Sequence, residues 1–409
     1  MSELGLETET TVADDAPPVV AGFRFGGIAA GIKKRGGPDL AVIVADDLVA
    51  CAGVFTRNLV VAAPVVQSRA HLAEAPRARA VIVNSGNANA CTADVGTRDA
   101  ATMAALVAAG LGCEARDVQV CSTGVIGAPL PMDKVTAGVP VVLAEAVPEG
   151  LPAFARAIMT TDTRPKVRWD TATIGGRHVT AAGACKGAGM IHPDMATMLG
   201  FVVTDAQVGG ADLVAIWRRV CGRTFNAISV DGDTSTNDTA LCLASGRAGG
   251  EALTGEALLA LEALLERVAG ELAKDIVRDA EGATKLVAIT VRGAASESDA
   301  RRAANTVATS PLVKTAVHGE DPNWGRLVAA AGRSGARVEV ERVTVKIGDV
   351  VIFAEHRWHG GEAEKAANAV MQRPEFEVTL DLGLGEHAHT VYTCDFSADY
   401  VRINADYRS

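Results

Sequence analysis

One threonine lies in the most informative stretch of the sequence, Lys186–Leu199 (KGAGMIHPDMATML). The hydroxyl of Thr197 could attack the carbonyl of Ala196 and form an ester, which water would then hydrolyse. The break would leave Thr197 with a free α-amine, whose pKa is ordinarily about 7.7–8.0. Part of that amine is neutral near pH 7 and can take the proton from the threonine hydroxyl. A plain strand position is the alternative for Thr197, and composition and spacing alone favour it.

Four polar loops are further candidates for chemistry, because all four contain hydroxyl residues, and most of them also contain glycine or asparagine. They are Asn84–Ala90, Cys121–Gly127, Thr160–Thr163 and Asp231–Asp238. Such loops can offer backbone N–H groups and hydroxyls to an anion or an oxyanion. Each loop alone is also ordinary turn chemistry, since Gly, Asn, Asp and Ser dominate turns for steric reasons. Four of them in one chain favour a functional site.

Familiar cofactor and nucleophile motifs are missing from the sequence. Lys186–Gly189 begins like a glycine loop, but His192 stands where the third glycine of Gly-x-Gly-x-x-Gly belongs. There is no Walker A pattern and no Gly-x-Ser-x-Gly. The pairs His356/His359 and His387/His389 lack further ligands, so we expect no metal site. The sequence therefore contains none of the usual motifs of a nicotinamide-dependent enzyme, an ATP-binding protein or a serine hydrolase.

The elements that would position these loops alternate between short apolar strands and alanine-rich helices. Strands are expected over 40–45, 49–55, 81–84, 118–122, 179–185, 199–204, 227–230, 240–244, 284–291, 338–345, 350–355 and 376–382. Helices are expected over 96–109, 211–220 and 299–307, and from Glu256 to about Ile276, where apolar residues recur at spacings of three and four. This interspersed pattern predicts a mixed α/β architecture of layered sheets and helices.

Length and charge distribution suggest two lobes behind a short tail. The 409-residue chain begins with an acidic segment and has its first basic residue at Arg24, so we expect a disordered tail over 1–21 and no targeting signal. A first lobe is predicted over 22–280 and a second over 281–409, with the boundary near the Ala280–Thr284 turn.

Composition excludes some classes of partner. The net charge of −10 argues against a nucleic-acid partner, although a local cationic pocket could still bind an acidic small molecule. No apolar run approaches the ~18 residues that span a bilayer, so no membrane partner is expected. The eight cysteines form no Cys-x-x-Cys pair and favour a reducing cytoplasm, with a catalytic cysteine as an open alternative.

Seven segments together resemble one known family. They are Asn84–Thr92 (NSGNANACT), Ser122–Gly127 (STGVIG), Met159–Lys166 (MTTDTRPK), Lys186–Leu199, Ser229–Thr239 (SVDGDTSTNDT), Gly319–Arg326 (GEDPNWGR) and Cys394–Ser409 (CDFSADYVRINADYRS). In this order they resemble the ornithine acetyltransferase family, also called glutamate N-acetyltransferase, over nearly the whole chain from about Gly22. The resemblance implies a layered fold of the N-terminal-nucleophile type, like that of certain aminopeptidases.

The resemblance also implies roles for individual residues. Thr197 matches the nucleophile, with self-cleavage between Ala196 and Thr197, and Thr123 with Gly124 matches the oxyanion hole. The positions that match substrate-binding residues are Thr163, Lys186, Thr197, Glu281, Asn404 and Ser409. From charge, we expect Lys186 to pair with a substrate carboxylate and Glu281 with a substrate ammonium.

The function implied is that of a cytoplasmic, self-cleaving acetyltransferase of arginine biosynthesis. It would move acetyl from N2-acetyl-L-ornithine to L-glutamate through an acetyl-threonine intermediate, giving L-ornithine and N-acetylglutamate. No metal or nucleotide cofactor is implied, and the use of acetyl-CoA as a second donor stays open. The two fragments would assemble as an α2β2 heterotetramer. Two alternatives remain: an N-terminal-nucleophile aminopeptidase or other hydrolase, and a non-enzymatic amino-acid-binding protein.

Overall fold

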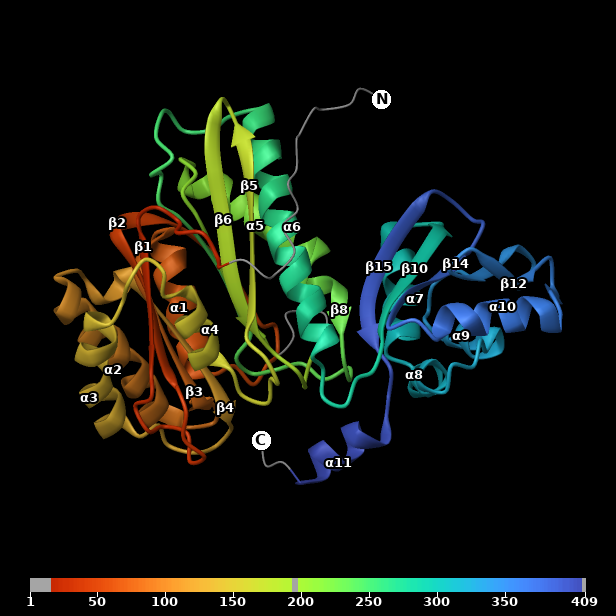
Figure 1. The fold of residues 1–409 in the computed structure, drawn as a ribbon, viewed down its shortest axis with the longest axis horizontal. Helices are drawn as coiled ribbons and strands as arrows, with labels where there is room; N and C mark the ends of the chain where they lie inside the picture. Colours follow the sequence, from red (N-terminus) through yellow and green to blue (C-terminus); the bar gives the residue numbers. More distant parts are fainter. Residues whose placement is uncertain (1–15, 193–197, 407–409) are drawn as a thin grey trace.

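The structure is a computed structural model that describes residues 16–192 and 198–406. Two β-sheets, each covered by helices, lie side by side and are joined by the long helix α6 (Glu256–Arg278) and the loops beside it (Figure 1). The layered α/β architecture predicted from the sequence is confirmed.

The first sheet has eight strands among the described residues, in the order β4-β3-β2-β9-β7-β6-β5 with β1 paired to β2. Its strands are β1 (Phe23–Ile28), β2 (Leu40–Phe55), β3 (Arg77–Asn87), β4 (Val118–Val125), β5 (Lys166–Ile174), β6 (Arg177–Lys186), β7 (Leu199–Thr204) and β9 (Thr239–Ala244). In β2, Leu40 and Val42 face one hydrophobic cluster while Ala41 and Ile43 face another. Both faces of the sheet are thus buried, which explains the continuous apolar runs of its strands.

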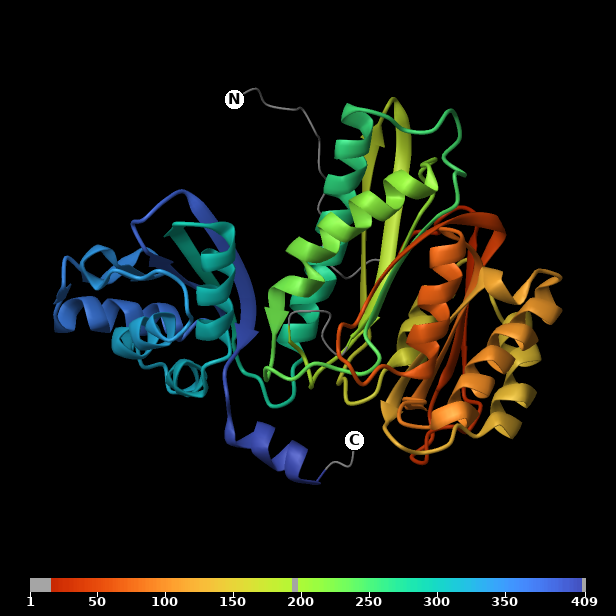
Figure 2. The same ribbon diagram turned by 180° about the vertical axis from the view of Figure 1, so that it is seen from behind.

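Helices cover both faces of this sheet (Figure 2). They are α1 (Ala63–Glu74), α2 (Ala93–Leu111), α3 (Met132–Ala144), α4 (Leu151–Ile158), α5 (Gly210–Arg223) and α6. Phe154 of α4 packs edge-to-face on Phe201 of β7, with ring centroids 5.2 Å apart. The predicted start of α6 at Glu256 is confirmed, and its apolar stripe from Leu261 to Ile276 is buried as its period of three to four residues requires.

The second sheet has the order β13-β12-β11-β14-β10-β15-β8 in the described part of the chain. Its elements are β8 (Ile228–Ser229), β10 (Leu286–Ala294), β11 (Thr344–Ile347), β12 (Val350–Ala354), β13 (Arg357–Trp358), β14 (Glu375–Asp381), β15 (His387–Cys394), α7 (Glu297–Ala308), α8 (Pro311–His318), α9 (Trp324–Gly332) and α10 (Gly361–Met371). Residues 16–192 and 198–406 also contain the short 3₁₀ turns η1 (Ala115–Asp117), η2 (Phe225–Ala227) and η3 (Val340–Arg342). The exposed helix α11 (Ala398–Asp406) leaves this sheet and extends back below the first one (Figure 1).

The chain crosses between the sheets twice close to the predicted loop 231–238. It leaves the first sheet after β7, adds β8 to the second sheet beside β15, and returns to the first sheet as β9. Loop 231–238 connects β8 to β9 and therefore lies where the two sheets meet.

The strand predictions differ most from the structure in two regions. The segments 40–45 and 49–55 form the single strand β2, whose pairing with β3 shifts register between Val44 and Val49. The strand predicted over 338–345 is wrong before residue 344, because 340–342 form η3. The partner strand explains this boundary: β14 ends at Asp381, opposite Thr344, and the chain then turns at Gly383, whose φ is +63°.

The lobe boundaries at 22–280 and 281–409 stay a prediction, and sheet pairing places β8 with the later strands. Of the predicted tail over 1–21, residues 1–15 lie outside the described part of the chain. Val20 is 1% exposed within the core around Phe23, so it belongs to the folded part.

Candidate functional site

Thr123 and Gly124 lie at the carboxyl end of β4, where it runs parallel to β3. They stand opposite Ser85 and Gly86 in the strand register. Gly124 has a φ of +133°, and a Cβ on it would lie 2.3 Å from the carbonyl carbon of Gly86. Only glycine permits this approach of two backbones. The predicted oxyanion-hole pair therefore lies where the backbones of β3 and β4 approach each other too closely for a side chain at Gly124.

Hydrogen bonds join three of the predicted polar loops into one unit. The Asn237 amide donates to the carbonyls of Ala88 (2.6 Å) and Ser122 (2.9 Å). The Ser122 hydroxyl donates in turn to Asn84 Oδ1 at 2.6 Å. The turn chemistry that the sequence shows in loops 84–90, 121–127 and 231–238 thus also fixes these loops against one another.

Lys186 ends β6 with a side chain directed at the oxyanion pair. It is 3% exposed, and its Nζ donates a hydrogen bond to Thr123 Oγ1 at 3.3 Å. Burial disfavours the charged amine and lowers the pKa of Lys186, although the nearby Asp162 carboxylate opposes this. Because the Thr123 hydroxyl accepts from Lys186, its own proton is free to be donated to a third group.

Glu281 lies just beyond the end of α6 and meets the loop that follows Lys186. Its backbone N–H donates to the Ala188 carbonyl at 2.9 Å, and its Oε2 accepts from the Asn404 amide of α11 at 2.9 Å. A Cβ on Gly189 would lie 2.4 Å from the same carboxylate oxygen. Gly189 thus leaves the space that the Glu281 carboxylate occupies.

Five of the predicted site residues line one cavity of about 150 Å³. They are Thr123, Gly124, Lys186, Glu281 and Asn404. The same cavity is lined by Thr160, Thr161 and Ser235–Asn237, which the sequence interpretation placed in polar loops but did not assign to the site. Their hydroxyl- and amide-rich loop sequences were the signal that could have included them.

The other predicted positions are not in this cavity or not described. Thr163 lines an adjoining cavity of about 350 Å³, which shares Thr161 and Glu281 with the first. Its hydroxyl donates to Asp279, and its backbone N–H donates to the same carboxylate at 3.1 Å. Ala196, Thr197 and Ser409 lie outside the described residues.

A buried charge cluster behind the cavity was not predicted from the sequence. Lys166 Nζ lies 2.6 Å from Asp162 Oδ1 and 2.5 Å from Asp279 Oδ2, and all three side chains are at most 4% exposed. Asp162 also accepts the backbone N–H groups of Thr160 (2.9 Å) and Gly187 (2.7 Å). Burial alone would raise the pKa of Asp162, but the Lys166 and Lys186 charges outweigh it and hold this pKa well below its usual range. The cluster thereby fixes the backbone on two sides of the cavity.

Asp238 is a further buried acid, which contacts the first described residue after the predicted cleavage site. It is 0% exposed, and its Oδ1 accepts the Met198 N–H at 2.8 Å. That N–H belongs to the peptide bond that follows Thr197. Oδ2 is buried without a hydrogen-bond partner among the described residues, and burial raises the pKa of Asp238 well above its ordinary value.

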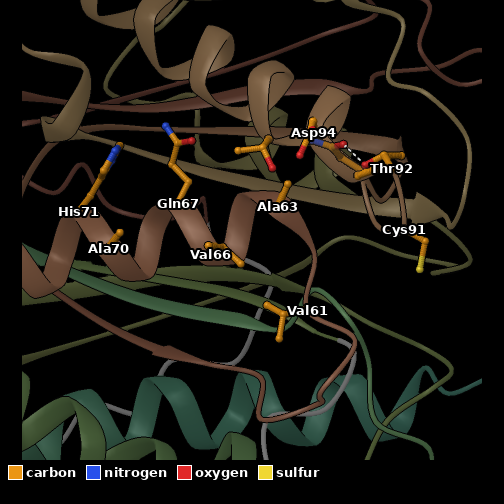
Figure 3. Close-up of a pocket in the computed structure, with 12 residues that line it drawn as sticks. Val61, Ala63, Val66, Gln67, Ala70, His71, Cys91, Thr92 and Asp94 are labelled. Atoms are coloured by element: carbon orange, nitrogen blue, oxygen red, sulfur yellow. Dashed lines mark hydrogen bonds between the residues drawn. The ribbon is translucent and has the colours of Figure 1, made fainter.

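A larger cavity, of about 560 Å³, lies between α1 and the start of α2 (Figure 3). Gln67 and His71 of α1 and Cys91, Thr92 and Asp94 of the facing segment line it. None of the described residues predicted to act in catalysis or substrate binding lines this cavity. We therefore assign the candidate site to the smaller cavity, where the predicted residues converge.

Residues 16–192 and 198–406 contain no group of three or more His, Cys, Asp or Glu side chains placed to hold a metal ion. Burial raises the pKa of the Cys185 thiol, which lies near Lys186, so this thiol is poorly suited to act as a nucleophile. None of the helices in these ranges is both long and apolar enough to span a bilayer.

A layered α/β fold that gathers a threonine hydroxyl, a glycine and a buried lysine around one small cavity has residues suited to an acyl-transfer enzyme. Comparison with known proteins agrees. The sequence profile of the ArgJ family matches residues 24–409. The chain is 51% identical over 392 residues to the arginine biosynthesis bifunctional protein ArgJ of Geobacter sulfurreducens, covering 95% of this chain and 100% of that protein. It is 48% identical to the protein of the same name from Methylococcus capsulatus, covering 95% and 96%.

The chain therefore belongs to the ArgJ family, and it is an acyltransferase of arginine biosynthesis. Among solved structures, a chain of the arginine biosynthesis bifunctional protein ArgJ from Bacillus halodurans aligns with a TM-score of 0.50 and 40% identity. That alignment covers 52% of this chain and 100% of the solved one. The predicted family and its fold are confirmed.

Proposed function

We propose that the protein cleaves itself between Ala196 and Thr197 and then transfers acetyl from N2-acetyl-L-ornithine to L-glutamate. The observation that carries this proposal is the contact between Lys186 and the Thr123 hydroxyl beside Gly124. Thr123 can donate its proton to a developing oxyanion because its oxygen accepts from Lys186. Removing one oxyanion-hole donor typically costs about 2.7–4 kcal/mol of transition-state stabilisation.

The reaction has two half-reactions. First, the Thr197 hydroxyl attacks the acetyl carbonyl of acetylornithine while the Thr197 α-amine takes its proton. The tetrahedral intermediate then breaks its C–N bond, and ornithine leaves with that proton. Second, the neutral α-amine of glutamate attacks the acetyl ester. A C–N bond forms, the C–O bond breaks, and the proton returns to Thr197.

We propose that Lys186 holds the α-carboxylate common to both substrates and that Glu281, with Asn404, receives an ammonium. Thr163 and Ser409 complete the proposed binding set. Because the acetyl group is conserved, the cycle needs no metal or nucleotide cofactor. Acetyl-CoA could form the same ester by releasing its thiol, and the name "bifunctional" of the relatives supports testing it.

Self-cleavage would leave pieces of 196 and 213 residues. The chain of the solved relative is covered in full but aligns with only 52% of this chain, so it is about as long as one of the two pieces. That agreement supports a relative made of two polypeptides. We propose an α2β2 assembly of the two pieces. Six of the eight cysteines are buried and unpaired, which supports a reducing cytoplasmic location.

The test compares the purified protein with Thr197→Ala. Denatured mass spectrometry should show two fragments, the second beginning at Thr197, and a whole chain in the variant. The purified protein should convert acetylornithine and glutamate to ornithine and acetylglutamate, with and without EDTA, and acetyl-CoA is then tried as the donor. Release of free acetate or amino acids without acetylglutamate would instead identify a hydrolase. A folded, uncleaved and inactive chain would identify an amino-acid-binding protein.

A further inference from the structure

The adjoining cavity of about 350 Å³ contains side chains of both charges at its surface. Arg35, Asp279, Glu281 and Asp406 line it, and it shares the lining residues Thr161 and Glu281 with the site cavity. A small amino acid bound with its α-amine at the oxyanion pair has room in this direction for its side chain. The charges in this second cavity are therefore the groups that a substrate side chain would meet.

Arg35 belongs to the loop between β1 and β2, and the loop is held from both ends. Asp39 accepts the backbone N–H groups of Ala30 (2.7 Å) and Lys33 (2.8 Å). The Arg35 guanidinium donates to the carbonyl of Thr160, next to the cavity wall. That partner is neutral, so the contact orients the guanidinium without cancelling its charge.

The acidic side chains of the cavity differ in whether a cation neutralises their negative charge. Asp279 is paired with the buried Lys166. Glu281 instead accepts from the neutral Asn404 amide, so that contact leaves its negative charge available. The cavity thus presents one oriented cation, Arg35, and the available carboxylate of Glu281, with the exposed Asp406 as a further acidic side chain in its lining.

A double-displacement enzyme must place two different side chains in turn beside one nucleophile. This step rests on the proposed function: acetylornithine ends in an ammonium, whereas glutamate ends in a carboxylate. We propose that Arg35 is a specificity-determining residue that selects glutamate by pairing with its side-chain carboxylate, while Glu281 serves the ornithine ammonium. A guanidinium suits this task because it binds a carboxylate through two parallel N–H donors.

The experiment measures kcat/KM for two acceptors, glutamate and glutamine, with acetylornithine as donor. Glutamine has nearly the same shape but ends in a neutral amide. The wild-type protein should prefer glutamate. In Arg35→Gln the glutamate-to-glutamine ratio should fall about tenfold or more, the range expected when a charge-assisted hydrogen bond is lost. Arg35→Lys keeps the charge and should retain part of the preference.

Lys34→Gln is the matched control, because Lys34 is an exposed cation in the same loop that lines neither cavity. It should leave the ratio unchanged. The proposal is overturned if Arg35→Gln keeps the wild-type glutamate-to-glutamine ratio. If kcat/KM also falls by the same factor for both acceptors, the role of Arg35 is structural. A wild-type protein that makes no acetylglutamate refutes the proposed function itself, a result distinct from an unchanged ratio.

Discussion

Lys166→Met should destabilise the protein by about 3–5 kcal/mol at pH 7, the usual cost of stranding a buried charge. Lys166 is the cation between Asp162 and Asp279, and its side chain is 1% exposed. Methionine fills a similar volume, so the packing change is small and the loss is mainly electrostatic. Removing the ammonium leaves two buried carboxylates without the cation between them, and the more distant Lys186 acts on Asp162.

The pH dependence of this effect has a definite sign. In the wild type the folded pKa of Asp162 lies below its unfolded value of about 3.9. Its contribution to stability is therefore present above pH ~4 and is lost as the pH falls through the folded pKa. Without Lys166, burial dominates and the pKa of Asp162 rises. The variant then gains stability relative to wild type as the pH falls from 7 toward 5.

Urea unfolding measures both effects, in a Thr197→Ala background that keeps one continuous chain. Adding Asp279→Asn to Lys166→Met should recover part of the loss, because one stranded charge is removed while Thr163 keeps a hydrogen-bonding partner. Lys274→Met is the control: Lys274 pairs with Glu271 at 2.8 Å, but both side chains are more than a quarter exposed. It should cost no more than about 1 kcal/mol. A Lys166→Met cost below about 1 kcal/mol at pH 7, or one that does not shrink at pH 5, would refute the reasoning.

Three further predictions concern single side chains. Gly124→Ala should lower kcat for acetyl transfer about 10²–10³-fold, since its Cβ would force the β3 and β4 backbones apart and displace an oxyanion donor. Asp238→Asn keeps an acceptor for the Met198 N–H and should self-cleave like wild type, whereas Asp238→Ala should cleave more slowly in a mass-spectrometry time course. The third prediction concerns Asp395, whose pKa is lowered. Burial would raise this pKa, but hydrogen bonds from backbone N–H groups and from His318 outweigh the effect of burial. The contribution of Asp395 to stability is therefore lost as the pH falls below about 4. Asp395→Asn should therefore flatten the fall of the urea midpoint between pH 5 and pH 3.

Local sequence patterns predicted the elements whose stability is mostly local. The α6 stripe and the strand over 199–204 match the structure because each pattern corresponds to one buried face or one buried strand. The strand expected over 338–345 was wrong because its extent depends on where β14 ends, and β14 is a partner more than thirty residues away in the sequence. The length of a strand depends on the partner strand as well as on its own residues, so the sequence pattern of one strand does not predict where it ends.

The same distinction applies to the site. The polar loops were recognisable one by one, since Gly, Asn and Ser mark turns wherever they occur. The Asp162–Lys166–Asp279 cluster was not, because its members look like ordinary surface charges until a contact over more than a hundred residues buries them. Arg35 was missed for the same reason. Its proposed role depends on its contact with Thr160, which is distant in the sequence, and on the cavity that it lines.

The topology of the first sheet explains how a chain could be cut at its active site and stay folded. Strands that precede the proposed cut, β2 and β6, flank the two that follow it, β7 and β9. Strand pairing from Lys186 opposite Leu199 to Ala181 opposite Thr204 holds β6 to β7. Strand β9 pairs with β2 along its whole length. The connection between β6 and β7 therefore closes a loop whose ends the sheet already holds together. Cutting it releases an α-amine at the nucleophile and breaks none of the strand pairing that positions Lys186, so the sheet that builds the site also tolerates the cleavage proposed to activate it.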